Sequence, residues 1–321
     1  MSFELILPFL RPREPLLLDE SISEIVGNPD ASWWYERDGI IHREKTISFA
    51  SGKLRTGLEV IANQLGKRLD EDNPILHAQL PDGSRLAAVI PPVVRLTPAL
   101  IIRKFTSRHY TVDDLIARGT LTRPLADFLA EQIRSGKTLL ISGGTGTGKA
   151  TLLRISADFI PDHDRIVVIE DTSELQIQKP NILAVECQTD TFKANITFDD
   201  LLKSALRWRP DRIILGEVRG IEARTLLDSF NTGHAGSLAT IHANSAEKAL
   251  HRFANLVMRN HTQTTFSDTE AEIGEAVDFV VHVERQPGRR IIREVLALRG
   301  YDRDAKRFLI EPVFEVKHAT A

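Results

Sequence analysis

Residues 138–153 read TLLISGGTGTGKATLL, and this stretch decides the fold. Thr138 to Ile141 are apolar enough for a buried strand, and Thr151 to Phe159 have helical character. Between them lies the pattern Gly-x-x-x-x-Gly-Lys, in the strand–loop–helix context that a phosphate-binding loop requires. Glycines let backbone N–H groups turn toward phosphate oxygens, and the helix N-terminus adds a favourable partial charge.

The loop and the first helical turn supply the candidate nucleotide-binding residues. They are Gly143, Gly144, Thr145, Gly146, Thr147, Gly148, Lys149, Ala150 and Thr151. Lys149 is expected to reach the β- and γ-phosphates of ATP. The alternative is a plain glycine turn between a strand and a helix, with the lysine merely solvated.

Position 150 departs from the usual pattern. A serine or threonine normally follows the lysine, and its hydroxyl binds Mg²⁺. Here the residue is Ala150, and Thr151 lies about 100° further round the helix, so it cannot simply replace the missing ligand. The sequence therefore predicts an ATP site while leaving Mg²⁺ binding and the rate of hydrolysis open.

Outward from the loop, apolar strands alternate with helices, which is typical of an α/β fold with a parallel sheet buried on both faces. The further strands expected in this sheet are Arg165–Ile169, Arg212–Leu215 and Ser237–Ile241. After residue 277, an antiparallel extension is expected from Phe279–Val283, Ile291–Leu298 and Phe308–Ile310.

The residues that precede the domain with the phosphate loop have a different pattern of apolar and polar residues. Leu54 to Leu65 place apolar residues on one helical face, and residues 75–90 read as a β-hairpin that Pro91-Pro92 ends. We therefore expect a small α+β domain over residues 1–105 and an α/β domain with a mainly parallel sheet over residues 106–321.

Polar side chains follow the expected parallel strands at the edge where open α/β sheets bind ligands. Glu217 is the best candidate for a general base, because hydrolysis needs a carboxylate to orient and deprotonate water. Its alternative role is an ion pair with Arg219 or Arg212. His234 and His242 are too few for a metal site, and fit as γ-phosphate sensors or as hydrogen-bonded core histidines.

Composition excludes several classes of protein. The formal charge is 41 − 44 = −3, too small for a protein that coats nucleic acid. One cysteine, Cys187, excludes an internal disulfide framework and a multi-cysteine zinc site. No run approaches the roughly 20 apolar residues of a membrane span, so we expect a soluble, cytoplasmic protein.

Four ordered blocks of this sequence together resemble the secretion ATPases of type II and type IV systems. These blocks are ISGGTGTGKATLL (141–153), similar to their Walker A segment; VIEDTSEL (168–175), similar to the Asp box; RWRPDRIILGEVRG (207–220), similar to Walker B; and NTGHAGSLATIHANS (231–245), similar to the His box. The segments LPDGSRLAAVIPP (80–92) and IIRKF (101–105) extend the resemblance toward the N-terminus. The chain looks most similar to the conjugative-transfer TrbB and pilus-assembly CpaF branch.

The resemblance implies a homohexameric ring that holds ATP between the N-terminal domain and a RecA-like P-loop domain. It also implies that Glu217 is the catalytic glutamate and Glu174 the Asp-box glutamate, and that His234 and His242 are linked to the γ-phosphate. Arg85 and Arg103 match motif positions whose arginines reach the phosphates in this family; the alternative for both is ordinary surface charge.

We therefore predict a cytoplasmic ATPase that is peripheral at the inner face of the cytoplasmic membrane. It would power conjugative transfer, secretion or pilus assembly with inner-membrane partners, and no sequence-specific nucleic-acid binding is expected. Two alternatives remain: an assembly scaffold with little turnover because of Ala150, and a RecA-like DNA motor. A local basic cluster would fit the DNA motor, but a solvated β-hairpin explains it about as well; its members are Arg285, Arg289, Arg290 and Arg293.

Overall fold

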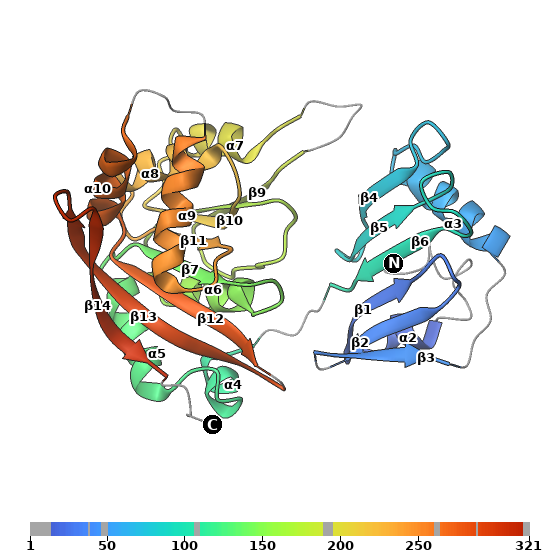
Figure 1. Ribbon diagram of the computed structural model, residues 1–321, viewed down its shortest axis with the longest axis horizontal. Helices are drawn as coiled ribbons and strands as arrows, with labels where there is room; N and C mark the ends of the chain where they lie inside the picture. Colours follow the sequence, from blue (N-terminus) through green and yellow to red (C-terminus); the bar gives the residue numbers. More distant parts are fainter. Residues whose placement is uncertain are drawn as a thin grey trace. The chain divides into compact units, whose positions relative to one another are not determined.

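A computed structural model describes residues 14–37, 39–45, 51–105, 110–188, 195–259, 264–286 and 288–316. The chain divides into two compact units, Met1–His109 and Tyr110–Ala321 (Figure 1). The expected boundary after Phe105 lies beside residues 106–109, which are outside the described residues.

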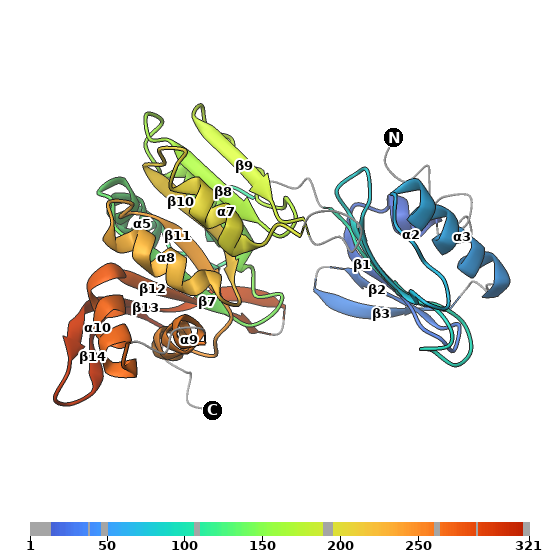
Figure 2. The same cartoon turned by 90° about the horizontal axis from the view of Figure 1, so that it is seen from above.

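The first unit is an antiparallel sheet covered by helices on one face. Its six strands lie in the order β3-β2-β1-β6-β5-β4. The strands are β1 (Ile22–Gly27), β2 (Trp33–Arg37), β3 (Ile40–Glu44), β4 (Ile75–Gln79), β5 (Arg85–Val89) and β6 (Ala99–Arg103). Helices α2 (Glu14–Leu18) and α3 (Ser51–Gln64) lie against the same face of the sheet (Figure 2). The apolar stripe of α3 is buried there, as its spacing predicts, through Leu54, Leu58 and Ile61.

The second unit is built on an eight-stranded sheet in the order β14-β13-β12-β7-β11-β10-β8-β9. Its strands are β7 (Leu139–Gly143), β8 (Ile166–Glu170), β9 (Ile182–Glu186), β10 (Arg212–Val218), β11 (Leu238–Ile241), β12 (Phe279–Gln286), β13 (Arg289–Asp302) and β14 (Arg307–Glu315). Strands β12, β7, β11, β10, β8 and β9 run parallel, while β13 and β14 are antiparallel to their neighbours. The predicted mainly parallel sheet is confirmed.

Helices cover both faces of this sheet. They are α4 (Val112–Ala117), α5 (Arg123–Arg134), α6 (Lys149–Asp158), α7 (Phe198–Ala205), α8 (Glu222–Asn231), α9 (Ala246–Met258) and α10 (Phe266–Ala276). Residues of α5 and α6 share one apolar core with the sheet, and residues of α7, α8, α9 and α10 share the other. The central strands are therefore buried on both sides, which is why they read as continuous apolar runs.

Two strands differ from the expectation. Phe279–Val283 belongs to β12, which pairs in parallel with β7 from Phe279 opposite Leu139, so only β13 and β14 form the antiparallel extension. Helix α10 precedes β12 and lets the chain cross over before it enters the sheet, as parallel pairing requires. Strand β9 was not anticipated from the sequence. It is an edge strand with half-buried or exposed side chains, although its residues, ILAVE, form an apolar run like those of the central strands.

Cys187 follows β9 and is buried. Burial raises the pKa of its thiol to about 11, and the nearby negative charges of Asp171 and Glu222 act in the same direction.

Among the described helices, none has both the length and the apolar character of a membrane span.

Candidate nucleotide site

The phosphate loop joins β7 to α6, as the sequence predicts. Gly146 and Gly148 have left-handed backbone conformations, with φ of 70° and 94°. Gly148 is also the N-cap residue of α6. These conformations favour glycine, since a side chain would be strained there.

Lys149 is the first residue of α6, and its side chain is buried. Its Nζ donates a hydrogen bond to the carbonyl oxygen of Gly144 at 2.8 Å. Burial lowers the pKa of Lys149; the negative charge of Glu217 opposes this shift, and the positive charge of Arg219 adds to it. The lysine thus sits in surroundings that do not fully compensate its charge, and a bound phosphate would compensate it.

The other loop side chains divide by exposure. Thr145 and Ala150 are exposed, and Thr151 is half-buried. Thr147 is buried, and its hydroxyl donates to the Gly144 carbonyl oxygen at 2.9 Å. The hydroxyl of Thr147 therefore holds the loop closed, and Ala150 leaves position 150 without an oxygen ligand.

An irregularity in β10 directs Glu217 toward the loop. Leu215 pairs with Ala239 of β11, but the next pair is Val218 with Ile241, so two residues of β10 oppose one of β11. The hydroxyl of the opposing residue, Thr240, donates to the Gly216 carbonyl oxygen at 2.6 Å. Bulges of this kind re-aim a side chain at the end of a strand.

Glu217 lies at the centre of a charged network. Its Oε1 lies 3.1 Å from His242 Nε2, and its Oε2 lies 3.1 Å from Arg219 Nη2. Arg219 also reaches Asp171, with Nη1 at 3.1 Å from Oδ2. The ends of β8, β10 and β11 thus meet at one edge of the sheet. The ion pair with Arg219 exists, whereas Arg212 pairs elsewhere, with buried Asp164 at 2.7 Å.

His242 faces several cations. Burial lowers its pKa, and the positive charges of Lys149, Arg252 and Arg219 act in the same direction, while Glu217 opposes them. A lowered histidine pKa keeps the imidazole neutral at pH 7. A neutral ring can donate from Nε2 to Glu217 and accept at Nδ1.

Glu174 is exposed on the segment that follows β8. The backbone N–H groups of Glu174 and Leu175 donate to Oε1 of Glu170, at 2.9 and 3.0 Å. Glu170 is buried, and burial raises its pKa to about 7. The hydrogen bonds that Glu170 accepts from the backbone of Glu174 and Leu175 have no sequence signal.

His234 is not brought together with the other candidates. It precedes β11, and its Nδ1 lies 2.9 Å from the carbonyl oxygen of Pro210, which precedes β10. This is the amino end of the strands, while the phosphate loop follows the carboxyl end of β7. The length of β7 separates the two edges by about 13 Å, at about 3.3 Å per residue. Placement at that edge does not support the expected link to the γ-phosphate, because both edges belong to one rigid sheet.

Arg85 and Arg103 belong to the first unit. They pair directly opposite each other on β5 and β6, and their neighbours Leu86 and Ile102 point to the other face, into the apolar core. Both arginines therefore lie on the face that α2 and α3 do not cover. Arg103 Nη2 forms an ion pair with Glu24 Oε1 at 2.6 Å.

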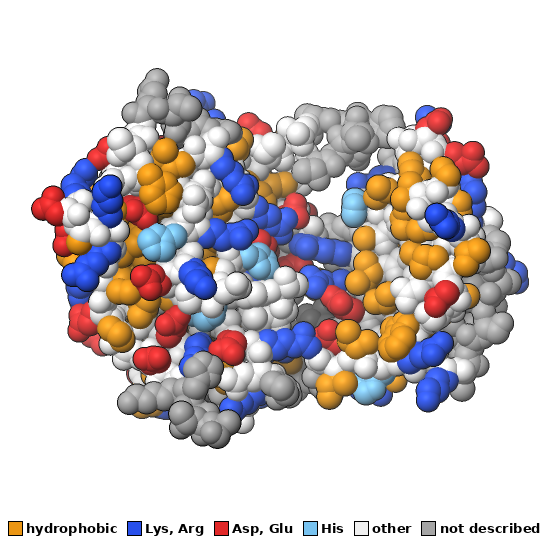
Figure 3. Space-filling view, in the orientation of Figure 1, with side chains coloured by type: hydrophobic (Ala, Val, Ile, Leu, Met, Phe, Trp, Pro, Cys, Tyr) orange, Lys and Arg blue, Asp and Glu red, His pale blue; other side chains and the backbone are white. Residues whose placement is uncertain are grey.

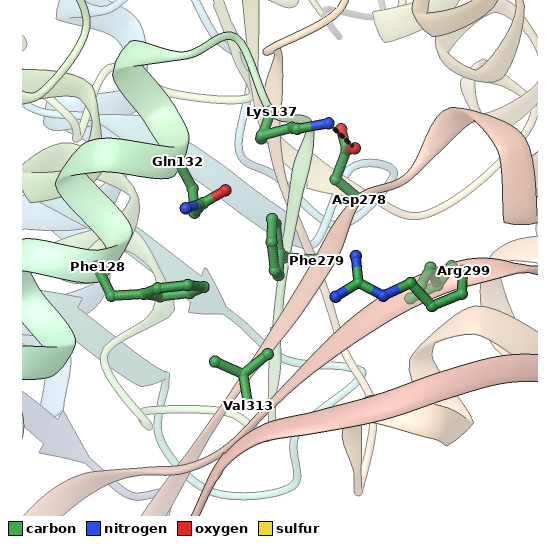
Figure 4. A pocket seen from close by; sticks show the side chains of 8 residues that line it. Phe128, Gln132, Lys137, Asp278, Phe279, Arg299 and Val313 are labelled. Atoms are coloured by element: carbon green, nitrogen blue, oxygen red, sulfur yellow. Dashed lines mark hydrogen bonds and ion pairs between the residues drawn. The ribbon is translucent and has the colours of Figure 1, made fainter.

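A cavity of about 210 Å³ lies at the opposite edge of the second unit's sheet from the loop (Figure 4). Phe128 and Phe279 form an edge-to-face pair in its wall, and its lysine, Lys137, is ion-paired with Asp278 at 2.9 Å. Arg299 there pairs with Glu311. Among the described residues, no group of three or more His, Cys, Asp and Glu side chains is arranged to hold a metal ion.

The parallel sheet, the loop ending in Lys149 and the carboxylate at a neighbouring strand end define the class of P-loop nucleotide-binding proteins. The family described as "Type II/IV secretion system protein" matches residues 10–296, and the chain belongs to this family of type IV secretion and conjugation ATPases.

One relative is the conjugal transfer protein TrbB of Rhizobium radiobacter, 38% identical over 292 residues, which span 88% of this chain and 85% of TrbB. A solved relative is the VirB11 ATPase of the Brucella suis type IV secretion system in complex with sulphate, with 27% identity, a TM-score of 0.50, and coverage of 91% and 97% of the two chains. The Legionella pneumophila ATPase DotB shares the fold, with a TM-score of 0.63, 20% identity, and coverage of 92% and 81%.

Proposed function

We propose that this protein hydrolyses ATP as a homohexameric traffic ATPase of a type IV secretion, conjugative transfer or pilus assembly machine. The observation that carries the proposal is the meeting of Lys149 with the Glu217–His242–Arg219 network at one edge of the sheet. The sulphate bound by the VirB11 relative is consistent with an anion site in this fold.

In this proposal the loop amides and Lys149 bind the phosphates, and Glu217 accepts a proton from the attacking water. His242 and Arg219 orient the two carboxylate oxygens, each of which keeps lone-pair capacity for the water. Glu174 and Asp171 provide further carboxylates at this edge. We also propose that Arg85 and Arg103 of the first unit contact the phosphates, because they match motif positions whose arginines do so in the family.

Mg²⁺ prefers oxygen ligands and keeps several waters, so in this proposal it would be held mainly by the phosphates of the nucleotide and by water. Mg²⁺ bound with the nucleotide would neutralise phosphate charge. We place the working protein in the cytoplasm at the inner face of the membrane, with inner-membrane components of the machine as partners.

Charge distribution disfavours the DNA-motor alternative. On the face shown in Figure 3, acidic side chains are present among the basic side chains of the second unit, and the formal net charge of the chain is −3. Nonspecific DNA channels use continuous basic grooves with aromatic platforms.

The scaffold alternative rests on Ala150, and one substitution decides it. We expect wild-type protein to hydrolyse ATP, and Ala150→Thr to raise kcat about tenfold, or about 1.4 kcal/mol in the barrier. The added hydroxyl would act mainly on charge stabilisation in the transition state, so nucleotide affinity should change little. Steady-state phosphate release and nucleotide binding, titrated with Mg²⁺ for both proteins, measure this.

The matched control is Thr151→Ser, because this substitution changes the neighbouring residue while keeping a hydroxyl. Equal kcat and equal Mg²⁺ dependence in wild type and Ala150→Thr would mean that Ala150 is silent. Nucleotide binding without measurable hydrolysis in both would favour the scaffold.

ATP should also promote ring assembly. Because a ring places each nucleotide near an interface, ligand bound to the assembled form stabilises it by mass action. Native mass measurements at micromolar protein should show hexamers increasing with ATP and Mg²⁺. Monomers alone under both conditions would contradict the hexameric proposal while leaving the nucleotide site in place.

A further inference from the structure

The basic cluster on the β12–β13 hairpin divides into two pairs. Arg289 Nε donates to Gln286 Oε1 at 2.9 Å, and Arg293 Nε lies 3.7 Å from Glu284 Oε2, so both bind neighbours within the hairpin. Arg290 Nε instead donates to the carbonyl oxygen of Gly146, in the phosphate loop, at 3.0 Å. A solvated hairpin does not explain this contact, which spans 144 positions of the sequence.

The hairpin lies directly against the loop (Figure 2). A Cβ atom added at Gly146 would lie 3.3 Å from Arg285 Nη1, and one added at Gly148 would lie 3.2 Å from Arg290 Cδ. Both distances are tighter than ordinary contacts of a Cβ atom. The two arginines therefore pack on the loop backbone at the positions where glycine leaves room for them.

The register places these two arginines directly opposite each other. Arg285 of β12 pairs with Arg290 of β13. Like charges opposite each other on one face destabilise a hairpin. An anion bound in the adjacent loop would offset that repulsion, so the pair is suited to a site that is occupied by phosphate.

We propose that Arg290 is a positioning residue of the phosphate loop and that, with Arg285, it makes a cationic clamp for nucleoside di- and triphosphates. The hydrogen bond to the Gly146 carbonyl fixes the peptide between Gly146 and Thr147 and polarises it, which strengthens its N–H as a donor. The two guanidinium charges also raise the local potential for phosphate. This inference rests on the proposed nucleotide site.

The test compares Arg290→Ala, Arg290→Lys and Arg285→Ala with Arg289→Ala, a matched control on the same hairpin whose side chain binds Gln286. We expect Arg290→Ala to weaken the binding of both ADP and ATP about tenfold, and Arg285→Ala to weaken it less. Arg290→Lys keeps the charge and loses the Nε donor, so it should restore part of the loss. Arg289→Ala should stay within twofold of wild type.

The readouts are Kd values by titration at two salt concentrations, together with kcat at saturating ATP. Loss of the clamp should raise KM with little change in kcat, and binding should depend more on salt in wild type than in Arg290→Ala. Melting temperatures show whether each variant is folded; if Arg290→Ala is not, Arg290→Gln replaces it as the neutral variant.

Unchanged Kd in the neutral Arg290 variant overturns the clamp, and so does an equal loss in Arg289→Ala, which would indicate general electrostatics. In either case tight wild-type binding that Lys149→Ala removes would leave the proposed function standing. A wild-type protein that binds no nucleotide would overturn both.

Discussion

Replacing Glu217 by glutamine should lower ATP turnover by about 10²-fold or more, the scale that a positioned general base contributes. The amide has nearly the shape of the carboxylate and can still accept a hydrogen bond, but it cannot take a proton from water. Nucleotide affinity should stay near the wild-type value, because phosphate binding is assigned to Lys149 and the loop amides. Single-turnover hydrolysis beside equilibrium nucleotide binding separates these two effects.

Glu186→Gln is the control for this experiment, because Glu186 ends the parallel strand β9, two strands from β10, at the same edge of the sheet and pairs in register with Glu170 of β8. It should keep turnover within a few-fold of wild type. Loss of nucleotide binding in Glu217→Gln, with no separate effect on turnover, would show instead that the ion pair with Arg219 is structural.

Lys149→Ala should abolish tight ATP binding and leave the fold intact. The lysine is the buried cation of the loop, and its Nζ donates a hydrogen bond to the carbonyl oxygen of Gly144. Replacing Lys149 removes a charge-assisted contact with phosphate. The substitution leaves no buried charge at position 149, because alanine is neutral. Titration of ATP, with circular dichroism and thermal melting as checks of folding, measures the outcome.

Lys137→Ala provides the matched control. Lys137 precedes the same strand, β7, at its other end, where it is ion-paired with Asp278. It should bind ATP as wild type does. Equal affinity in wild type and Lys149→Ala would refute the assignment of the phosphate loop.

Much of the second unit could be predicted from the sequence because its signals are local. The phosphate loop is a continuous motif, and strands buried on both faces read as apolar runs. The parallel pairing of β12 with β7 could not be predicted from the sequence, because it depends on a crossover and not on the residues of Phe279–Val283 themselves. Edge strand β9 carries a comparable apolar run, ILAVE, so its sequence does hold a signal for a strand, although its side chains are only half-buried or exposed.

The sequence singles out candidate site residues one by one, but it gives only part of their arrangement. Glu217 lies near the carboxyl end of β10 and His242 follows β11, so their convergence at one sheet edge could be expected. His234 lies before its strand rather than after it, and the short spacing between His234 and His242 conceals that they occupy opposite edges. The contact of Arg290 with Gly146 joins residues far apart in the chain, and no local pattern reports it.

The setting of Cys187 makes this protein convenient for spectroscopic labelling. A thiol needs exposure and its thiolate form to react with a maleimide dye, and Cys187 has neither, being buried with a pKa of about 11. Because it is the single cysteine of the chain, a new cysteine introduced on the surface of either unit would take up the dye selectively in the otherwise unaltered protein. Pairs of such labels, one on each unit, could then test whether the distance between the units changes when nucleotide is added, without the usual prior step of removing native cysteines.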